Sequence, residues 1–185
     1  MIYTRAVASW LPLALAITGL CLLTYFAGQQ SFRSSLNDPQ IQIAEDAADA
    51  LSNGVSPAQI VPREPLINAN KSLRTFIAIY DQNGTPLEAS ATINGKPPRP
   101  PSGVFENAAW WSHGHTWQPS PDVRIATVII PYTFGNTKGY VLAGRNMREI
   151  ESRIIDFGFK VLVAWGVIIL STLVLQLMIT FLKLR

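Results

Sequence analysis

The sequence predicts an α+β fold in which a five-stranded antiparallel sheet packs against long N- and C-terminal helices, with two transmembrane helices flanking this domain. Three observations predict it. Two apolar runs, residues 6–27 and 161–182, stand near the chain ends. Between them, short apolar segments alternate with Gly, Asn and Pro turns, which is typical of strands joined by hairpins. Helical periodicity precedes and follows these segments.

The second apolar run is long enough to cross a bilayer. Its 22 residues would span about 33 Å as a helix, close to the ~30 Å hydrocarbon core. The first run has no charge and follows Arg5, so a cleaved signal peptide is the alternative. Tyr25 is bulky for the position three residues before a cleavage site at Gly28, which favours an uncleaved span. The expected division is 1–28 and 157–185 for the spans, and 29–156 for the domain.

Charge near the spans predicts the topology. Arg5, Lys183 and Arg185 lie at the chain ends, which favours a cytoplasmic location for both termini. Arg33 and Arg148 flank the spans on the other side and argue for the reverse, but a long middle segment translocates largely regardless of its charge. We therefore expect the middle domain outside the cytoplasm. With Lys183 to Arg185 as the only residues after the second span, we expect no catalytic or signalling domain there.

Composition excludes several classes of protein. Between residues 29 and 160 there are 12 basic and 12 acidic side chains, so this segment has no net charge, and no basic run in it indicates binding of nucleic acid. The single Cys21 excludes a disulfide framework and a cysteine-based zinc site. Serines lack the context of a catalytic nucleophile. We expect no enzyme and no cofactor.

The domain contains the signals of each expected element. Asn37, Asp38 and Pro39 resemble a helix start, and the helix that follows has an apolar face of Ile41, Ala44, Ala48 and Leu51. A Pro-rich loop occupies residues 96–101, and a short helix is expected at 104–110. Asn146 and Glu149 have the spacing of a capping box and predict the start of the last helix. The expected strands are 75–81, 87–93, 115–118, 124–130 and 139–144.

This architecture resembles the extracytoplasmic PAS-like domains (of the PDC or Cache type) of bacterial membrane receptors. Short motifs are similar to those of a group of small, uncharacterised two-span bacterial membrane proteins that lack a transmitter domain: Asn37-Asp38-Pro39-Gln40, Tyr80-Asp81, Gly84-Thr85-Pro86, Trp117-Gln118-Pro119, Arg124-Ile125-Ala126 and Gly144-Arg145. The resemblance implies the bacterial inner membrane, a periplasmic domain, and a small organic acid or amino acid as ligand.

Two arginines are candidate ligand-binding residues. Arg124 and Arg145 stand at the ends of strands that are otherwise apolar, and a buried guanidinium needs a partner. Asp81 at the end of the first strand is the predicted partner. The alternative is that the planar fork of Arg binds the carboxylate of a ligand, with Tyr80 and Trp117 completing the site; core packing is the alternative for Trp117.

Two further groups have weaker signals. His113 and His115 have metal-ligand spacing, but no acidic residue or Cys accompanies them, so we expect no metal. Trp110 and Trp111 predict either an anchor at the bilayer interface or the lid of a pocket.

A stripe on the last helix predicts self-association. Met147, Ile150, Ile154 and Phe157 are three or four residues apart, as in a coiled-coil seam, although packing on the domain's own sheet is the alternative.

The function expected from these features is a non-enzymatic membrane protein with a sensor-like domain. The domain would bind a small molecule or a partner protein and act in signalling through another membrane protein. The alternative is a structural scaffold, or accessory subunit, of a membrane complex with no ligand. Internally paired arginines and a filled core would favour the scaffold, and a cavity facing the guanidinium groups would favour the sensor.

Overall fold

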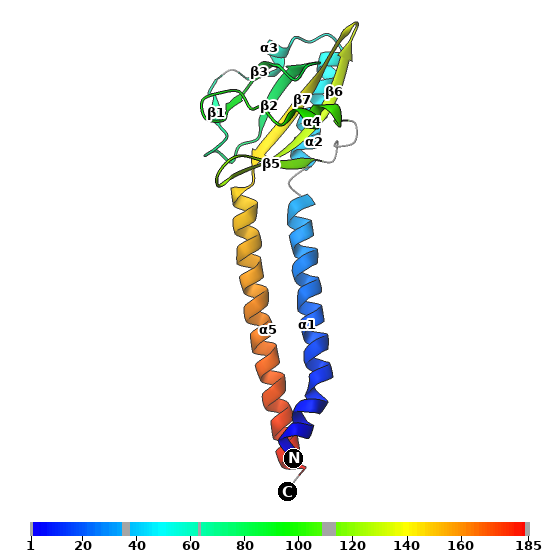
Figure 1. Ribbon diagram of the computed structural model, residues 1–185, viewed down its shortest axis with the longest axis vertical. Coiled ribbons are helices and arrows are strands. Elements are labelled where there is room, and N and C mark those ends of the chain that lie inside the picture. Colours follow the sequence, from blue (N-terminus) through cyan, green and yellow to red (C-terminus); the bar gives the residue numbers. More distant parts are fainter. Residues whose placement is uncertain (1, 35–37, 63, 109–113, 184–185) are drawn as a thin grey trace. The chain divides into compact units, whose positions relative to one another are not determined.

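The computed structural model describes residues 2–34, 38–62, 64–108 and 114–183. The chain forms two compact units, each described here by itself. The helix unit contains the chain up to Phe32 and again from Ser152, and the domain unit is Arg33–Glu151. Helix α1 (Ile2–Ser34) and helix α5 (Arg148–Leu182) supply the helix unit (Figure 1).

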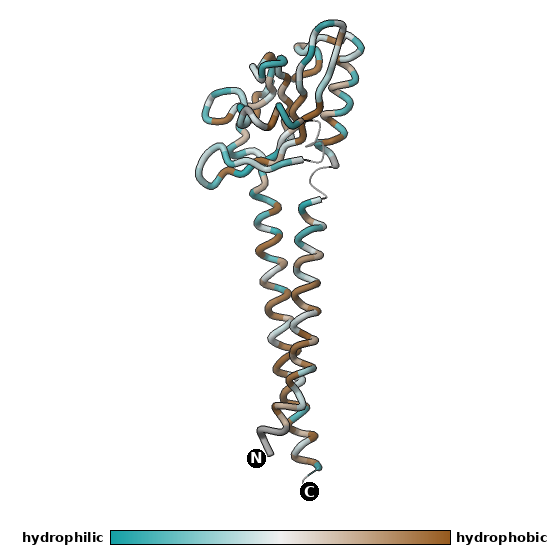
Figure 2. Tube along the Cα trace, turned by 45° about the vertical axis from the view of Figure 1, so that its right-hand side comes forward, coloured by the Kyte–Doolittle hydropathy of each residue, from teal (hydrophilic) through white to brown (hydrophobic). Residues whose placement is uncertain are grey.

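Both helices of the helix unit are long and apolar enough to cross a membrane, as their hydropathy shows in Figure 2. They are antiparallel, and three side-chain hydrogen bonds join them. The donor and acceptor atoms are Trp10 Nε1 to Thr172 Oγ1 at 3.1 Å, Trp165 Nε1 to Thr18 Oγ1 at 3.0 Å, and Gln176 Nε2 to Ser9 Oγ at 2.9 Å. The polar residues that interrupt the apolar runs therefore serve to pair the helices.

The domain unit is built on the predicted five-stranded antiparallel sheet, which is confirmed. Its order is β3-β2-β7-β6-β5. The strands are β2 (Phe76–Asp81), β3 (Pro86–Ala89), β5 (His115–Ser120), β6 (Val123–Phe134) and β7 (Thr137–Asn146). The β6–β7 hairpin is longer than predicted, because pairing continues to Phe134 and Thr137 around a two-residue turn.

Helix α2 (Asp38–Ser52) covers one face of the sheet. Its apolar face is mostly alanine, which lets the helix approach the strands closely. The buried cluster between them contains Ala44, Ala47, Ala48, Leu51, Val61, Ile77, Ile79, Val128, Tyr132, Val141 and Ala143. Helix α5 contributes no residue to this cluster.

The opposite face is covered by irregular chain and short elements. These are helix α4 (Ser102–Glu106) and a parallel pair of strands, β1 (Ile67–Asn68) and β4 (Ala91–Thr92). Helix α3 (Pro57–Ile60) lies on the α2 side, where Ile60 packs against the α2 cluster. The predicted strand 87–93 is broken at Ser90, where the chain leaves β2. Ser90 Oγ accepts a hydrogen bond from the Ile77 N–H at 2.9 Å, after which the chain pairs with β1. The helix predicted at 104–110 is observed as α4, which is shorter than predicted.

Candidate functional site

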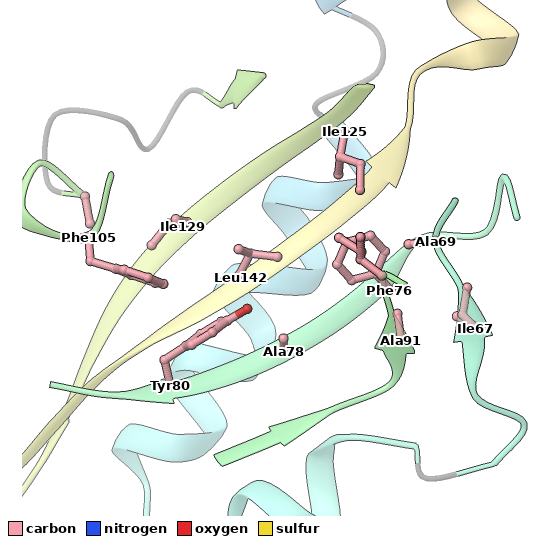
Figure 3. Close-up of a cluster of buried hydrophobic side chains, with 12 residues drawn as sticks. Ile67, Ala69, Phe76, Ala78, Tyr80, Ala91, Phe105, Ile125, Ile129 and Leu142 are labelled. Atoms are coloured by element: carbon pink, nitrogen blue, oxygen red, sulfur yellow. The ribbon is translucent and has the colours of Figure 1, made fainter. Parts of the chain in front are cut away.

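The predicted ligand residue Tyr80 lies in the core, on the sheet face opposite α2 (Figure 3). Its side chain is fully buried, and its hydroxyl donates to the Pro98 carbonyl at 2.6 Å. The Phe105 ring lies 4.9 Å from the Tyr80 ring and 5.2 Å from that of Tyr140. Burial raises the pKa of Tyr80 despite the opposing charge of Arg99. The chain's own aromatic rings therefore fill this face.

Trp117 is half-buried and packs against the same core cluster as Tyr80. Its Nε1 is buried without a hydrogen-bond partner in the described part of the chain. The structure thus places two of the predicted residues together, but in packed core.

Asp81 is not the arginine partner that the sequence suggested, and that prediction is wrong. Its carboxylate accepts hydrogen bonds from the N–H groups of Asn83 at 2.9 Å and Thr85 at 2.8 Å. This closes the turn between β2 and β3, since short-range backbone donors reach the carboxylate first. The same charge adds to burial in raising the pKa of Tyr132.

Arg124 is paired within the domain. Its Nη1 lies 2.9 Å from Glu151 Oε1, and the two side chains are 46% and 36% exposed. Arg124 also lines a small pocket of about 100 Å³ with His115, Thr116 and Met147. That volume is well below the ~300 Å³ at which small-molecule pockets begin.

Because the Arg124 pair is exposed and has one contact, we expect Arg124→Lys to lower the free energy of unfolding by less than about 1 kcal/mol. Arg145→Lys is the comparison, because Arg145 uses two separate nitrogens that one ammonium does not replace. Thermal unfolding of both variants measures the difference. A larger loss in Arg124→Lys than in Arg145→Lys would contradict the expectation.

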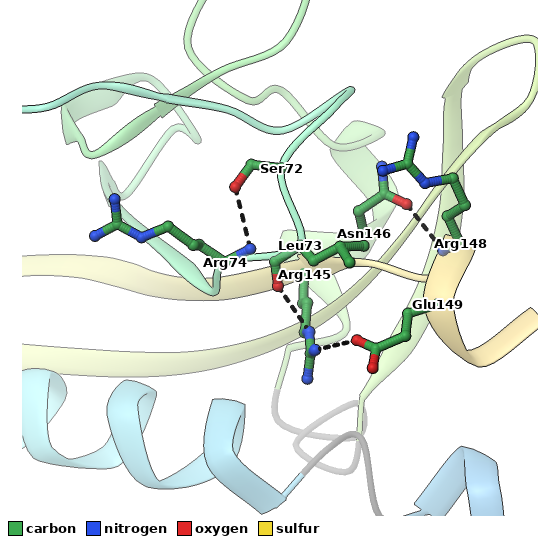
Figure 4. Close-up of polar contacts among 7 residues, drawn as sticks. All are labelled: Ser72, Leu73, Arg74, Arg145, Asn146, Arg148 and Glu149. Atoms are coloured by element: carbon green, nitrogen blue, oxygen red, sulfur yellow. Dashed lines mark hydrogen bonds and ion pairs between the residues drawn. The ribbon is translucent and has the colours of Figure 1, made fainter. Parts of the chain in front are cut away.

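Arg145 stands where β7 leads into α5. Its Nε donates to the Leu73 carbonyl at 2.8 Å, and its Nη2 lies 2.6 Å from Glu149 Oε2 (Figure 4). Both side chains of the ion pair are less than one-third exposed. The guanidinium thus bonds a carbonyl and a carboxylate of the same chain.

Asn146 extends the same contacts. Its Nδ2 donates to the carbonyls of Ala69 at 2.9 Å and Asn70 at 3.2 Å. Its Oδ1 accepts from the Arg148 N–H at 2.9 Å, and α5 begins at Arg148, two residues after the predicted start. Arg148 Nη2 donates to the Lys71 carbonyl at 3.1 Å.

We call Arg145, Asn146, Arg148 and Glu149, with residues 69–73, the junction cluster. It fixes the end of β7 and the first turn of α5 to a segment more than 70 residues earlier in the chain. Its chemistry is that of a structural clamp, since the contacts described above are hydrogen bonds and an ion pair within the chain. The capping signal at Asn146 could be read from the sequence, but nothing in residues 69–73 marks them as its partner.

Three of the four residues of the predicted association stripe are buried within a single chain, and Phe157 is half-buried. Met147 and Ile150 are 6% exposed, and Ile154 is 9% exposed. The Phe157 ring packs edge-on against Phe32, with centroids 5.6 Å apart. A parallel dimer through this stripe stays a prediction.

His115 is the described member of the predicted histidine pair. His115 is near Thr127, with Nε2 3.0 Å from Oγ1, and burial lowers its pKa. No group of three or more His, Cys, Asp or Glu side chains gathers among the described residues. Trp110, Trp111 and His113 lie outside them.

Comparison with protein-family models, curated proteins and solved structures finds no match to this chain.

Proposed function

We propose that this chain is a non-catalytic accessory subunit of a membrane protein complex. In this proposal α1 and α5 cross the bacterial inner membrane, and the PAS-like domain is periplasmic and docks a partner protein. The apolar length of the two helices and their interhelical hydrogen bonds support the membrane location. The five-stranded antiparallel sheet with α2 on one face supports the PAS-like resemblance.

The observation that carries the docking function is that the chain itself supplies partners for three of the predicted ligand residues, Tyr80, Arg124 and Arg145. Arg124 pairs with Glu151, Arg145 with Glu149 and the Leu73 carbonyl, and the Tyr80 hydroxyl with the Pro98 carbonyl. A carboxylate ligand would have to displace these contacts and find space in a filled core. Binding through the surface of the domain requires neither change.

The topology is tested by cysteine labelling. We expect Asn83→Cys, on a Cys21→Ala background, to react with an impermeant thiol reagent in intact cells. Asn83 is exposed in the β2–β3 turn, so only the membrane would shield it. Lys183→Cys is the control and should react only after lysis, because both termini are proposed to be cytoplasmic. The reverse pattern would place the domain in the cytoplasm.

A ligand sensor is the second candidate function, and the junction cluster favours it. The cluster connects the sheet to α5, which continues without a break from Arg148 to Leu182, so a change in the domain has a defined path to that helix. Organic acids and amino acids that bind the folded chain would raise its melting temperature by mass action. A saturable rise that Arg145→Lys abolishes would favour the sensor over the accessory subunit.

The accessory function is tested by quantitative proteomics of membranes from cells that lack the chain. Subunits of a complex stabilise one another by mass action. We therefore expect one other membrane protein to fall in abundance, and the wild-type chain to restore it. An unchanged set of membrane proteins would contradict the proposal.

A further inference from the structure

A groove of about 410 Å³ lies on the domain surface between α2 and the chain that leads from α3 into β1 and β2. We call it the α2 groove. Its lining is mainly apolar, and the described residues that matter for its chemistry are Ile43, Asp46, Ala47, Glu64, Pro65 and Arg74. Its described lining shares no residue with the junction cluster and does not include Tyr80, Trp117 or Arg124.

Apolar surface continues from the groove into solvent. Ile43 on its wall is 38% exposed, and Leu66, between the lining residues Pro65 and Ile67, is 59% exposed. A site for a small molecule encloses most of its ligand, whereas this groove opens onto exposed side chains. Exposed apolar residues beside a groove are typical of a protein-binding surface.

The charge around the groove identifies the kind of partner. Residues 38–67 contain five acidic residues and one basic residue, Arg63. Asp46 and Glu64 line the groove, and Arg74 is the single base among the described lining residues. The described lining therefore carries one net negative charge around an apolar floor.

We propose that the α2 groove binds a basic amphipathic segment of a partner protein, with an apolar side chain in the groove and Lys or Arg beside Asp46 and Glu64. Anchor side chains that fill pockets supply most of the affinity of such contacts, and complementary charge supplies specificity and association rate. This inference rests on the proposed docking function and adds the site and the chemistry of the partner.

The test uses the full-length chain in nanodiscs of neutral phosphatidylcholine and a labelled helical peptide built of Leu and Lys. We expect saturable binding, weakened about tenfold by Asp46→Lys, which corresponds to ~1.4 kcal/mol. Asp49→Lys is the matched control, because it makes the same charge change at an exposed site on the same helix outside the groove lining. The affinity of the Asp49→Lys variant for the peptide should fall less than about threefold, since salt screens the more distant charge.

A second pair of variants tests the apolar anchor. Ile43→Asp should weaken binding more than Val55→Asp, although the two side chains are equally exposed at 38%. Thermal unfolding of each variant checks that the fold is kept. The proposal is overturned by equal losses within both pairs, by equal binding of the same peptide with Glu in place of Lys, or by the chain binding a second copy of itself in place of the peptide. If the chain is still found in a complex with another protein, such a result rules out the α2 groove as the binding site and leaves the proposed docking function intact.

Discussion

Replacement of Asn146 by Ala is expected to lower the free energy of unfolding of the domain by about 2–4 kcal/mol. The side chain is 3% exposed and makes three hydrogen bonds, two to carbonyls of residues 69–70 and one from the first turn of α5. Ala69 is 1% exposed, so water does not replace the lost donor. The first turn of α5 also loses its cap in the Asn146→Ala variant.

Hydrogen exchange locates the effect. In Asn146→Ala the amides of residues 67–73 and 147–151 should exchange faster, because the two segments are no longer held together. Asn107→Ala is the control: its exposed side chain makes one hydrogen bond, to the Gly103 carbonyl at 2.8 Å, and should cost less than about 0.5 kcal/mol. If both variants lose the same stability, or if exchange rises uniformly, the junction cluster is not a clamp.

Phe105→Ala is expected to cost about 3–5 kcal/mol. The Phe105 side chain is 8% exposed and its ring contacts Tyr80 and Tyr140. Its removal leaves an apolar cavity beside Tyr80 and Tyr140. Cavities of this kind stay dry and take up small apolar molecules, so benzene should restore part of the lost stability.

Phe134→Ala is the matched control for this variant. The Phe134 side chain is 53% exposed at the β6–β7 turn, so its truncation should cost less than about 1 kcal/mol and should not create a site for benzene. Calorimetric unfolding of both full-length variants, with and without benzene, makes the comparison. A small loss in Phe105→Ala without benzene binding would show that Phe105 does not fill this face.

The strands could be predicted because their signals are local. The apolar runs of β2, β6 and β7 and the Asn-Gly pair at residues 83–84 give the sheet and its first hairpin without tertiary information. The break at Ser90 could not be predicted. It depends on a hydrogen bond between Ser90 Oγ and the Ile77 N–H, and on a parallel partner, β1, that has only two residues.

The candidate site was harder to predict than the strands, because residue type alone does not determine which polar groups bond to one another. Arg145 and Glu149 are four residues apart, but Arg145 lies in β7 and Glu149 in α5, so the helical ion-pair rule does not cover them. The prediction that Asp81 pairs with an arginine ignored the N–H groups of its own turn. The link from Asn146 to Ala69 spans 77 residues and follows only from the fold.

The mass of the intact particle that contains the full-length chain tests most directly whether the chain is a subunit of a complex. The particle is extracted from native membranes in mild detergent and measured by native mass spectrometry. We expect a heteromeric assembly, in which the 20.4 kDa chain is joined by a different protein at a fixed ratio. A particle that contains this chain alone, as a monomer or as copies of itself with a bound small molecule, would contradict it.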